Sequence, residues 1–256
     1  MGIDNQFLLI FSSGLFVALA ASFLGAFVVA KRMALVGDVL SHVALPGIGL
    51  ALVFGYDPIY GAAAFLLLAA FGTWFIERKT ELPPEAIIGT FFTATLALGV
   101  ILVPNEELFE SLFGNLFAIK PQDAAIIMAV SFIIFILTIM LSRRLTIGIV
   151  APDLAKSAGF KPDLSYLGFL LLFALSVALG IKLIGSVLMG ALTILPAVSA
   201  RNFSWSLKSF LSFSVILGLI MTGAGIFISN YFNFPPGPTV ILTGIIFFVI
   251  SLLFKK

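Results

Sequence analysis

Long apolar runs separated by short clusters of charge constrain the fold of this chain more than any other feature of its sequence. Two of the runs, FLLLFALSVALGI and VILTGIIFFVISLLF, contain no charged residue. A helix needs about 20 apolar residues to cross the hydrocarbon core of a membrane, whereas membrane-barrel strands alternate polar and apolar residues over roughly 10. With 61% hydrophobic and 10% charged residues, the chain has more apolar surface than one soluble core could bury. The sequence therefore predicts an all-α, polytopic membrane helix bundle forming a single transmembrane domain over residues 1–256.

The apolar runs predict eight or nine membrane-spanning helices. The N-terminal stretch MGIDNQ lacks a basic segment and leads directly into the first run, so we expect no cleaved signal peptide. The nine expected spans cover residues 7–30, 33–54, 58–76, 85–103, 122–142, 165–181, 183–200, 207–230 and 238–254.

The basic residues indicate the orientation of these spans, because Lys and Arg in short loops are retained on the cytoplasmic side. When alternate loops are assigned to that side, 12 of the 14 Lys and Arg residues fall inside, and only Lys120 and Lys182 stay outside. Asp57 and the acidic stretch at 105–110 also lie outside. We therefore expect the N-terminus outside and the C-terminus in the cytoplasm.

Two of the connecting segments have features of their own. Residues 108–119 are apolar but too short to span, which favours an interfacial or re-entrant helix on the outer side. In the inner loop APDLAKSAGFKP, Pro152 and Asp153 can begin a helix and Gly159 can end it. From the residues alone, this loop is either a short amphipathic helix or a simple interfacial turn.

Two prolines lie inside expected spans, Pro46 in the second and Pro196 in the seventh. A proline within a helix removes one backbone hydrogen bond and frees the carbonyl four residues earlier, which for Pro46 is that of His42. We therefore expect helix breaks at both prolines. The segments GDVLSHVALP and GSVLMGALTILP are loosely alike, a pattern that would place broken helices of an internal repeat around one site.

Asp38 and His42, the only histidine of the chain, lie four residues apart inside an expected span. On a helix this spacing projects both side chains from the same face. Counted from Arg32 at the cytoplasmic boundary, His42 lies about 15 Å into a hydrocarbon core about 30 Å thick. An ionisable group at that depth costs about 2.5–3.5 kcal/mol, so we expect the pair to face the bundle interior and to have a partner.

Three roles for this pair remain open from the residues alone. A carboxylate and an imidazole supply half of a coordination shell for Zn²⁺ or Mn²⁺, and Ser41, the carbonyl of His42 or the same pair from a second copy could complete it. The pair could instead relay protons, although few other titratable groups lie deep enough to extend a relay. In a purely structural role, Asp38 would accept a hydrogen bond from His42.

Other chemistry is excluded by the sequence. Without any cysteine the chain has no disulfide, thiolate ligand or thiol nucleophile. It lacks the G-x-x-x-x-G-K-[ST] phosphate loop and the H-E-x-x-H and G-x-S-x-G motifs. We therefore expect no enzyme activity from this chain alone, no resident cofactor and no nucleic-acid partner.

Five motifs in register resemble the permease subunits of bacterial zinc and manganese ABC importers, the ABC-3 family. They are GDVLSHVALPGIGLA, LFGNLFAI, APDLAKSAGFKP, GSVLMGALTILPAVSAR and FPPGPTVIL, and they extend over nearly the whole chain. The resemblance implies the general plan of the vitamin and siderophore importers. In that plan two permease copies, a homodimer in the lipid bilayer, form the pore, two ATP-binding cassette ATPase subunits dock on the cytoplasmic side, and an external metal-binding protein delivers the metal.

The resemblance also implies roles for individual residues. Asp38 and His42 would line the metal pathway. A cytoplasmic coupling helix near residues 150–163 would meet the ATPase through a D-x-A-x-x-x-G pattern. This pattern favours the helix over the simple turn for the inner loop. The outer acidic stretch would help to dock the external protein. The residues of these two segments are Asp153, Ala155 and Gly159, and Glu106, Glu107 and Glu110.

The expected function is therefore that of the permease subunit of an ATP-driven importer of Zn²⁺ or Mn²⁺, with Fe²⁺ as a further cargo, in the bacterial plasma (inner) membrane. Carboxylate and imidazole accept all three ions, so the sequence does not select among them. The alternatives are a permease for chelated iron or cobalamin, an ion-coupled secondary metal transporter and a non-transporting membrane scaffold.

Overall fold

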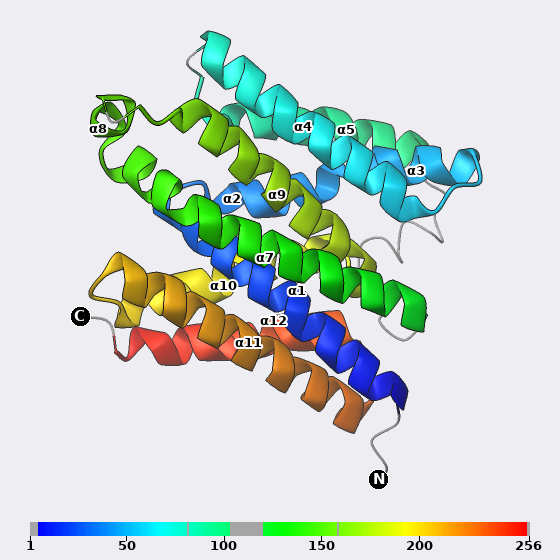
Figure 1. Cartoon of the computed structure of the whole chain (residues 1–256). Coiled ribbons are helices and arrows are strands. Elements are labelled where there is room, and N and C mark those ends of the chain that lie inside the picture. The colour runs from blue at the N-terminus through cyan, green and yellow to red at the C-terminus, as the bar shows by residue number, and fades with distance from the viewer. Residues whose placement is uncertain (1–4, 81, 103–119, 158, 255–256) are drawn as a thin grey trace.

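The structure, a computed structural model, describes residues 5–80, 82–102, 120–157 and 159–254 of the chain (Figure 1). Within these ranges every regular element is a helix and no strand occurs, in agreement with the all-α prediction. The helices are α1 (Asn5–Ala30), α2 (Ala34–Val43), α3 (Leu45–Val53), α4 (Pro58–Thr80), α5 (Pro84–Leu102), α7 (Pro121–Val150), α8 (Pro152–Ser157), α9 (Pro162–Ile184), α10 (Ser186–Phe203), α11 (Leu207–Phe232) and α12 (Pro236–Leu252).

The helices follow the expected spans closely. Five of them, α1, α4, α7, α9 and α11, are long and apolar enough to cross a membrane, and shorter apolar helical stretches cover Val39–Val53, Pro84–Gly99 and Pro236–Leu252. The second expected span is divided into α2 and α3, and α7 continues from the expected end at residue 142 to Val150. The helix expected at 108–119 lies outside the described residues.

Proline marks the start of many of these helices. Pro58, Pro84, Pro121, Pro162 and Pro236 are each the first residue of a long helix. The first turn of a helix has no internal partner for its N–H groups, so a residue without an N–H loses nothing there, and its fixed φ suits the helix. Prolines in the sequence therefore mark where many of these helices start.

Helices α1 and α9 lie at the centre of the bundle. Helix α1 packs on α7, α10 and α11, and α9 packs on α4 and α7. Phe27 of α1 and Phe169 and Phe173 of α9 are fully buried, and the rings of Phe27 and Phe169 meet edge to face with their centroids 6.4 Å apart. In Figure 1, α3, α4 and α5 lie on one side of this centre, and α11 and α12 lie on the other.

Glycine allows two pairs of helices to approach backbone to backbone. A Cβ added at Gly47 of α3 would collide with the carbonyl of Gly61 of α4, and the reverse is also true. A Cβ at Gly25 of α1 would collide with the carbonyl of Thr193 of α10. Small residues at such crossings give membrane helices close packing, because the apolar solvent supplies little drive for association.

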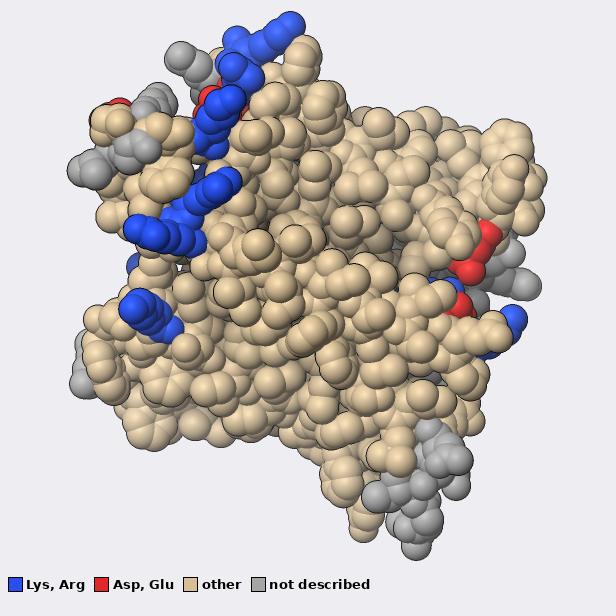
Figure 2. Space-filling model, in the orientation of Figure 1, with Lys and Arg blue, Asp and Glu red and all other residues tan. Residues whose placement is uncertain are grey.

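Basic residues are concentrated at one end of the bundle. Most Lys and Arg side chains in view gather at the end where α8 lies, whereas Asp and Glu are seen at both ends (Figure 2). The labelled chain ends also lie at opposite ends of the bundle, with the C-terminus on the basic side (Figure 1).

Candidate functional site

His42 lies near the end of α2 and turns toward α5. Its side chain is half-buried, and its Nδ1 atom is buried. The imidazole meets the ring of Phe92 on α5 edge to face, with the ring centroids 5.4 Å apart. Asp38 lies one turn earlier on the same helix. The side chain of Asp38 lies outside the described part of the structure, so the shared face of Asp38 and His42 stays a prediction.

The rest of α2 is held by other helices. Val36, Leu40 and Val43 are buried, and Ser41 is buried with its hydroxyl donating to the carbonyl of Gly37 at 3.2 Å. Gly37 leaves room for Phe173 of α9 and Thr193 of α10. Helix α2 thus packs against α10 and α9 on one side, while His42 meets α5 on the other.

The exposed side of α5 combines a small and polar face with three exposed large apolar residues, Leu96, Leu98 and Ile101. Ala86, Thr90, Thr93, Ala94 and Ala97 are all exposed in the single chain. Their hydroxyls do not require water, since Thr90 donates to the carbonyl of Ala86 at 2.9 Å and Thr93 donates to that of Gly89 at 3.1 Å. His42 therefore lies one helix away from a surface that presents small and polar side chains beside larger apolar ones.

The helix of the second expected span is interrupted at Ala44, two residues before Pro46. Helix α2 ends at Val43 and α3 begins at Leu45, with Ala44 between them. The carbonyl of His42, which Pro46 cannot engage, accepts the N–H of Ala44. By contrast α10 continues through the buried Pro196 from Ser186 to Phe203, so the break expected there does not form.

The two loosely similar segments of the sequence lie against one another. Residues 37–46 belong to α2 and the start of α3, residues 185–196 belong mostly to α10, and α2 and α10 are in extensive contact. Only the first of the two contains a helix interruption. The pair therefore shares a location in the bundle but not a common broken-helix geometry.

Helix α8 is a short helix in the inner loop, packed on α7 and α9. Ala155 is 1% exposed and fastens the helix to the bundle, whereas Asp153 and Gly159 are exposed. Gly159 has φ 75°, and the N–H of Phe160 returns to the carbonyl of Ala155 at 3.0 Å, which closes the helix as a left-handed glycine cap does. The structure thus presents Asp153 on the surface and Ala155 inward.

A partly buried charge directly after α1 was not foreseen from the sequence. Lys31, directly after α1, places its ammonium 3.3 Å from the centroid of the Tyr166 ring on α9. Lys31, Tyr166 and Glu77 of α4 line one cavity of about 230 Å³. Burial lowers the pKa of Lys31 to about 8, and the Glu77 carboxylate opposes part of that change. No local pattern links these residues, because they come from the turn after α1, from α4 and from α9.

The opposite end of the bundle is tied by one lysine between two carboxylates. Nζ of Lys182 lies 3.4 Å from an oxygen of Asp57 and 3.3 Å from an oxygen of Asp123. This contact joins the end of α9 to the start of α7 and to the turn before α4. Lys182 and Asp57, which the sequence assigned to the same side, therefore meet.

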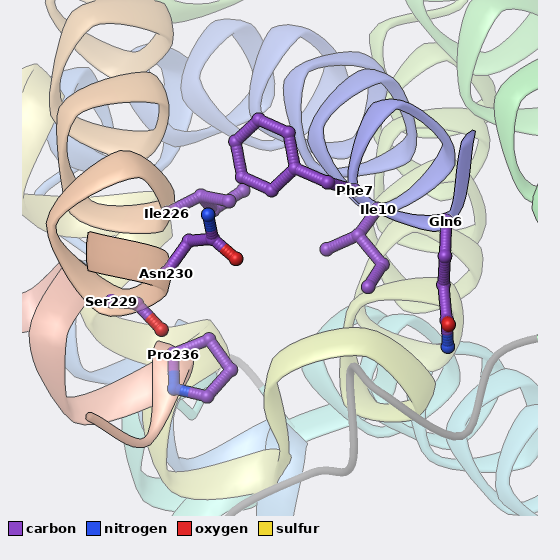
Figure 3. A pocket seen from close by; sticks show the side chains of 7 residues that line it. All are labelled: Gln6, Phe7, Ile10, Ile226, Ser229, Asn230 and Pro236. Carbon is purple, nitrogen blue, oxygen red and sulfur yellow. The ribbon is translucent and has the colours of Figure 1, made fainter. Parts of the chain in front are cut away.

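A pocket of about 140 Å³ opens between α1, α11 and α12 at the end where α1 begins (Figure 3). Phe7, Ile10, Ile226 and Pro236 form its apolar part, and the Asn230 amide borders it. None of the seven side chains drawn there is a carboxylate or an imidazole. This pocket lacks the donors that suit a transition metal.

No group of three or more His, Cys, Asp or Glu side chains gathers anywhere in the described part of the chain. Asp38 and His42 thus remain the candidate pair of metal ligands, and the acidic residues Glu106, Glu107 and Glu110 lie outside the described residues.

Comparison with known proteins gives consistent matches over the whole chain. The sequence profile described as the ABC 3 transport family matches residues 5–255. The manganese import system permease protein ScaB of Streptococcus parasanguinis is 31% identical over 239 residues, which cover 92% of this chain and 85% of that protein. The high-affinity zinc uptake system membrane protein ZnuB of Haemophilus influenzae is 29% identical over 254 residues, covering 95% of each.

The fold is also similar to that of a solved structure, PsaBC from Streptococcus pneumoniae in complex with Fab. The two superpose with a TM-score of 0.85 over 97% of this chain and 91% of the other, at 31% identity. Sequence and structure thus give the same assignment.

Proposed function

The chain belongs to the ABC 3 transport family, and from this premise we propose that it is the permease subunit of an ATP-driven importer of divalent transition metal ions. The names of its relatives, which are permeases for manganese import and zinc uptake, support Mn²⁺ or Zn²⁺ as cargo. The nucleotide chemistry resides on a separate ATPase subunit, consistent with the missing phosphate loop.

Asp38 and His42 form the transport site in this proposal. The observation that carries it is the placement of the only histidine of the chain on α2, half-buried against α5 and within the short apolar helical stretch Val39–Val53. An imidazole nitrogen and a carboxylate oxygen suit Zn²⁺ and Mn²⁺, and a bound dication offsets the cost of a buried carboxylate.

A second copy of the chain completes the passage. In a homodimer the small and polar face of α5 lines the path between the two copies, and each copy contributes its own Asp38 and His42. A site with few ligands per copy binds its ion moderately, which transport requires because the ion must also leave.

Helix α8 couples the bundle to the ATPase. Asp153 is exposed for contact, and Ala155 anchors the helix on α7 and α9, so a push on α8 reaches both long helices. With the basic end of the bundle in the cytoplasm, the N-terminus lies outside, where an external metal-binding protein delivers the ion. The location is the bacterial plasma membrane.

The experiment that tests the site is uptake of radioactive Mn²⁺ and Zn²⁺ by cells that express the chain with its ATPase and binding protein. Asp38→Asn and His42→Gln remove the charge and the metal-binding nitrogen with little change in volume. We expect each to lower uptake at least about tenfold, the effect of losing roughly 1.4 kcal/mol or more of stabilisation.

Asp163→Asn is the matched control, because Asp163 is an exposed carboxylate in the first turn of α9 and the change is chemically identical. It should leave uptake unchanged, with all variants present in the membrane at equal amounts. Normal uptake by Asp38→Asn would refute the site. Repeating the assay with the metal held by a tight chelator tests the cargo, and uptake that persists would favour a chelate permease.

A further inference from the structure

A groove between the end of α7 and the start of α9 combines cationic and apolar side chains next to α8. Its volume is about 430 Å³. Arg144 and Lys161 are exposed on it, and Leu164, also on its rim, is 60% exposed. Leu141 and Phe160 are half-buried within it. An exposed leucine beside two cations suits the boundary between lipid chains and lipid headgroups.

The length of α7 places this groove at that boundary. The helix has 30 residues and starts at Pro121, directly after Lys120. A hydrocarbon core about 30 Å thick is crossed in about 20 residues, so the core ends near Leu141, and Arg144 stands one turn beyond it. Lys161 and Leu164 flank the start of α9, at the corresponding depth on the neighbouring helix.

The two cations of the groove form no salt bridge with the nearby acidic residues of the described chain. Glu77 and Asp163 line the adjoining cavity, which shares Arg144 and Ser165 with the groove but also contains Lys31. The salt bridges found among the described residues involve neither Arg144 nor Lys161. Both cations are therefore available to an anion from the membrane side.

We propose that this groove binds the headgroup of an anionic phospholipid of the phosphatidylglycerol class. The lipid phosphate lies between Arg144 and Lys161, the Ser165 hydroxyl is within the same hollow, and an acyl chain runs along Leu141 and Leu164. Basic pockets between membrane helices on the cytoplasmic side bind anionic headgroups in this way. The apolar walls select a lipid over free phosphate, because only a lipid brings an acyl chain to the same place.

The bound lipid would brace the junction at which α8 joins α9. Gly159 and Phe160, which close α8, form part of the groove wall. A headgroup held there contacts α7 and the α8–α9 turn together and restrains their relative movement. The inference concerns lipid binding and does not depend on which ion the chain transports.

Lipid binding to the purified full-length chain tests the proposal directly. Delipidated protein in detergent is titrated with dioleoyl phosphatidylglycerol, dioleoyl phosphatidylcholine, or inorganic phosphate, and retained lipid is counted by native mass spectrometry. We expect a phosphatidylglycerol adduct that the other two probes do not reproduce. In R144Q/K161Q its apparent affinity should fall roughly tenfold or more, because each Lys or Arg near the surface adds to the attraction.

Arg143→Gln is the matched control, since Arg143 is the exposed neighbour of Arg144 and does not line the groove. It should retain the adduct, as should R144K/K161R, which keeps both charges. Equal loss in R143Q and R144Q/K161Q would overturn the proposal, because it would show general attraction to a basic surface. Binding of inorganic phosphate as tight as that of the lipid would overturn it too. If R144Q/K161Q does not fold, K161Q alone gives the same comparison.

Discussion

Single glycines determine how closely α3 and α4 approach. At Gly47 and Gly61 the two backbones touch, and any Cβ would meet a carbonyl of the other helix. The partner atoms belong to backbone, so they cannot rotate away as a side chain would. Overpacking of this kind costs typically about 1–3 kcal/mol.

We therefore predict that Gly61→Ala lowers the free energy of unfolding of the detergent-solubilised chain by about 1–3 kcal/mol, measured as a fall in its melting temperature. Gly89→Ala is the control, because Gly89 also lies in a helix but nothing stands within 4 Å of its added Cβ. That variant should be unchanged or stabilised, as Ala loses less backbone entropy on folding than Gly. Equal stability of the two variants would show that the α3–α4 contact is looser than described.

Lys31 gives the chain a pH-dependent stability. Its pKa falls from the ordinary 10.5 to about 8 through burial. Between about pH 8 and pH 10.5 the unfolded chain holds a proton that the folded chain has released, so stability rises with pH across this window, by at most about 1.4 kcal/mol per unit. Below pH 8 both states are protonated and this contribution is flat.

Melting temperatures of the wild type and of Lys31→Met, recorded from pH 7 to pH 10.5, check this prediction. The melting temperature of the wild type should rise relative to that of Lys31→Met as the pH rises, because methionine has no proton to lose. A difference in melting temperature that is independent of pH would contradict a lowered pKa of Lys31 beside Tyr166.

The residue pairs of the structure could not be predicted from the sequence. His42 with Phe92, Lys31 with Tyr166, and Lys182 with its two carboxylates each join different helices. Such pairs depend on the rotation and depth of whole helices, which apolar runs do not encode. The sequence could nevertheless single out Asp38 and His42, since ionisable residues within a span are rare and costly.

At the scale of elements, the helices themselves were predictable because the membrane leaves the backbone few choices. Each apolar run must satisfy its own hydrogen bonds, so it becomes a helix of about the length of the run. The two prolines behave differently. Helix α10 continues through Pro196, because a membrane helix tolerates an internal proline where its neighbours and local adjustments satisfy the freed backbone groups.

The left-handed residue that ends α8 allows a further prediction. Gly159 has φ 75°, where a residue with a Cβ pays about 1–2 kcal/mol and a β-branched residue pays most. We expect Gly159→Val to loosen α8 and to uncouple ATP hydrolysis by the assembled importer from metal uptake. Gly159→Asn, which adopts this conformation readily, should keep the two coupled.

The measurement is the ratio of metal ions taken up to ATP hydrolysed in proteoliposomes. A fall in this ratio for both variants would point to a role of the glycine other than its backbone conformation. An unchanged ratio for both would remove α8 from the coupling mechanism.

At the scale of the whole molecule, the concentration of basic residues at one end predicts how the bundle sits in the membrane. The chain has no cysteine, so a single introduced cysteine reports one position without background. Tyr56 and Trp205 suit this purpose, because they are 67% and 76% exposed and lie in turns at opposite ends of the bundle.

We predict that a membrane-impermeant maleimide labels Tyr56→Cys in intact cells and labels Trp205→Cys only after the cells are opened. This pattern follows from the retention of Lys and Arg on the cytoplasmic side. Labelling of Trp205→Cys alone in intact cells would show that the bundle has the opposite orientation. Helix α8 would then lie outside, away from an ATPase.

The interruption at Ala44 has a mechanical consequence for the whole bundle. One half of the span, α3, is seated on α4 through glycine backbones, while the other half, α2, rests on α10. Ala44 keeps helical dihedrals, so a movement of the α3–α4 block relative to α10 would bend this span where Pro46 removes a backbone hydrogen bond. His42 is two positions from Ala44, so such a bend would change the position of its imidazole relative to Phe92.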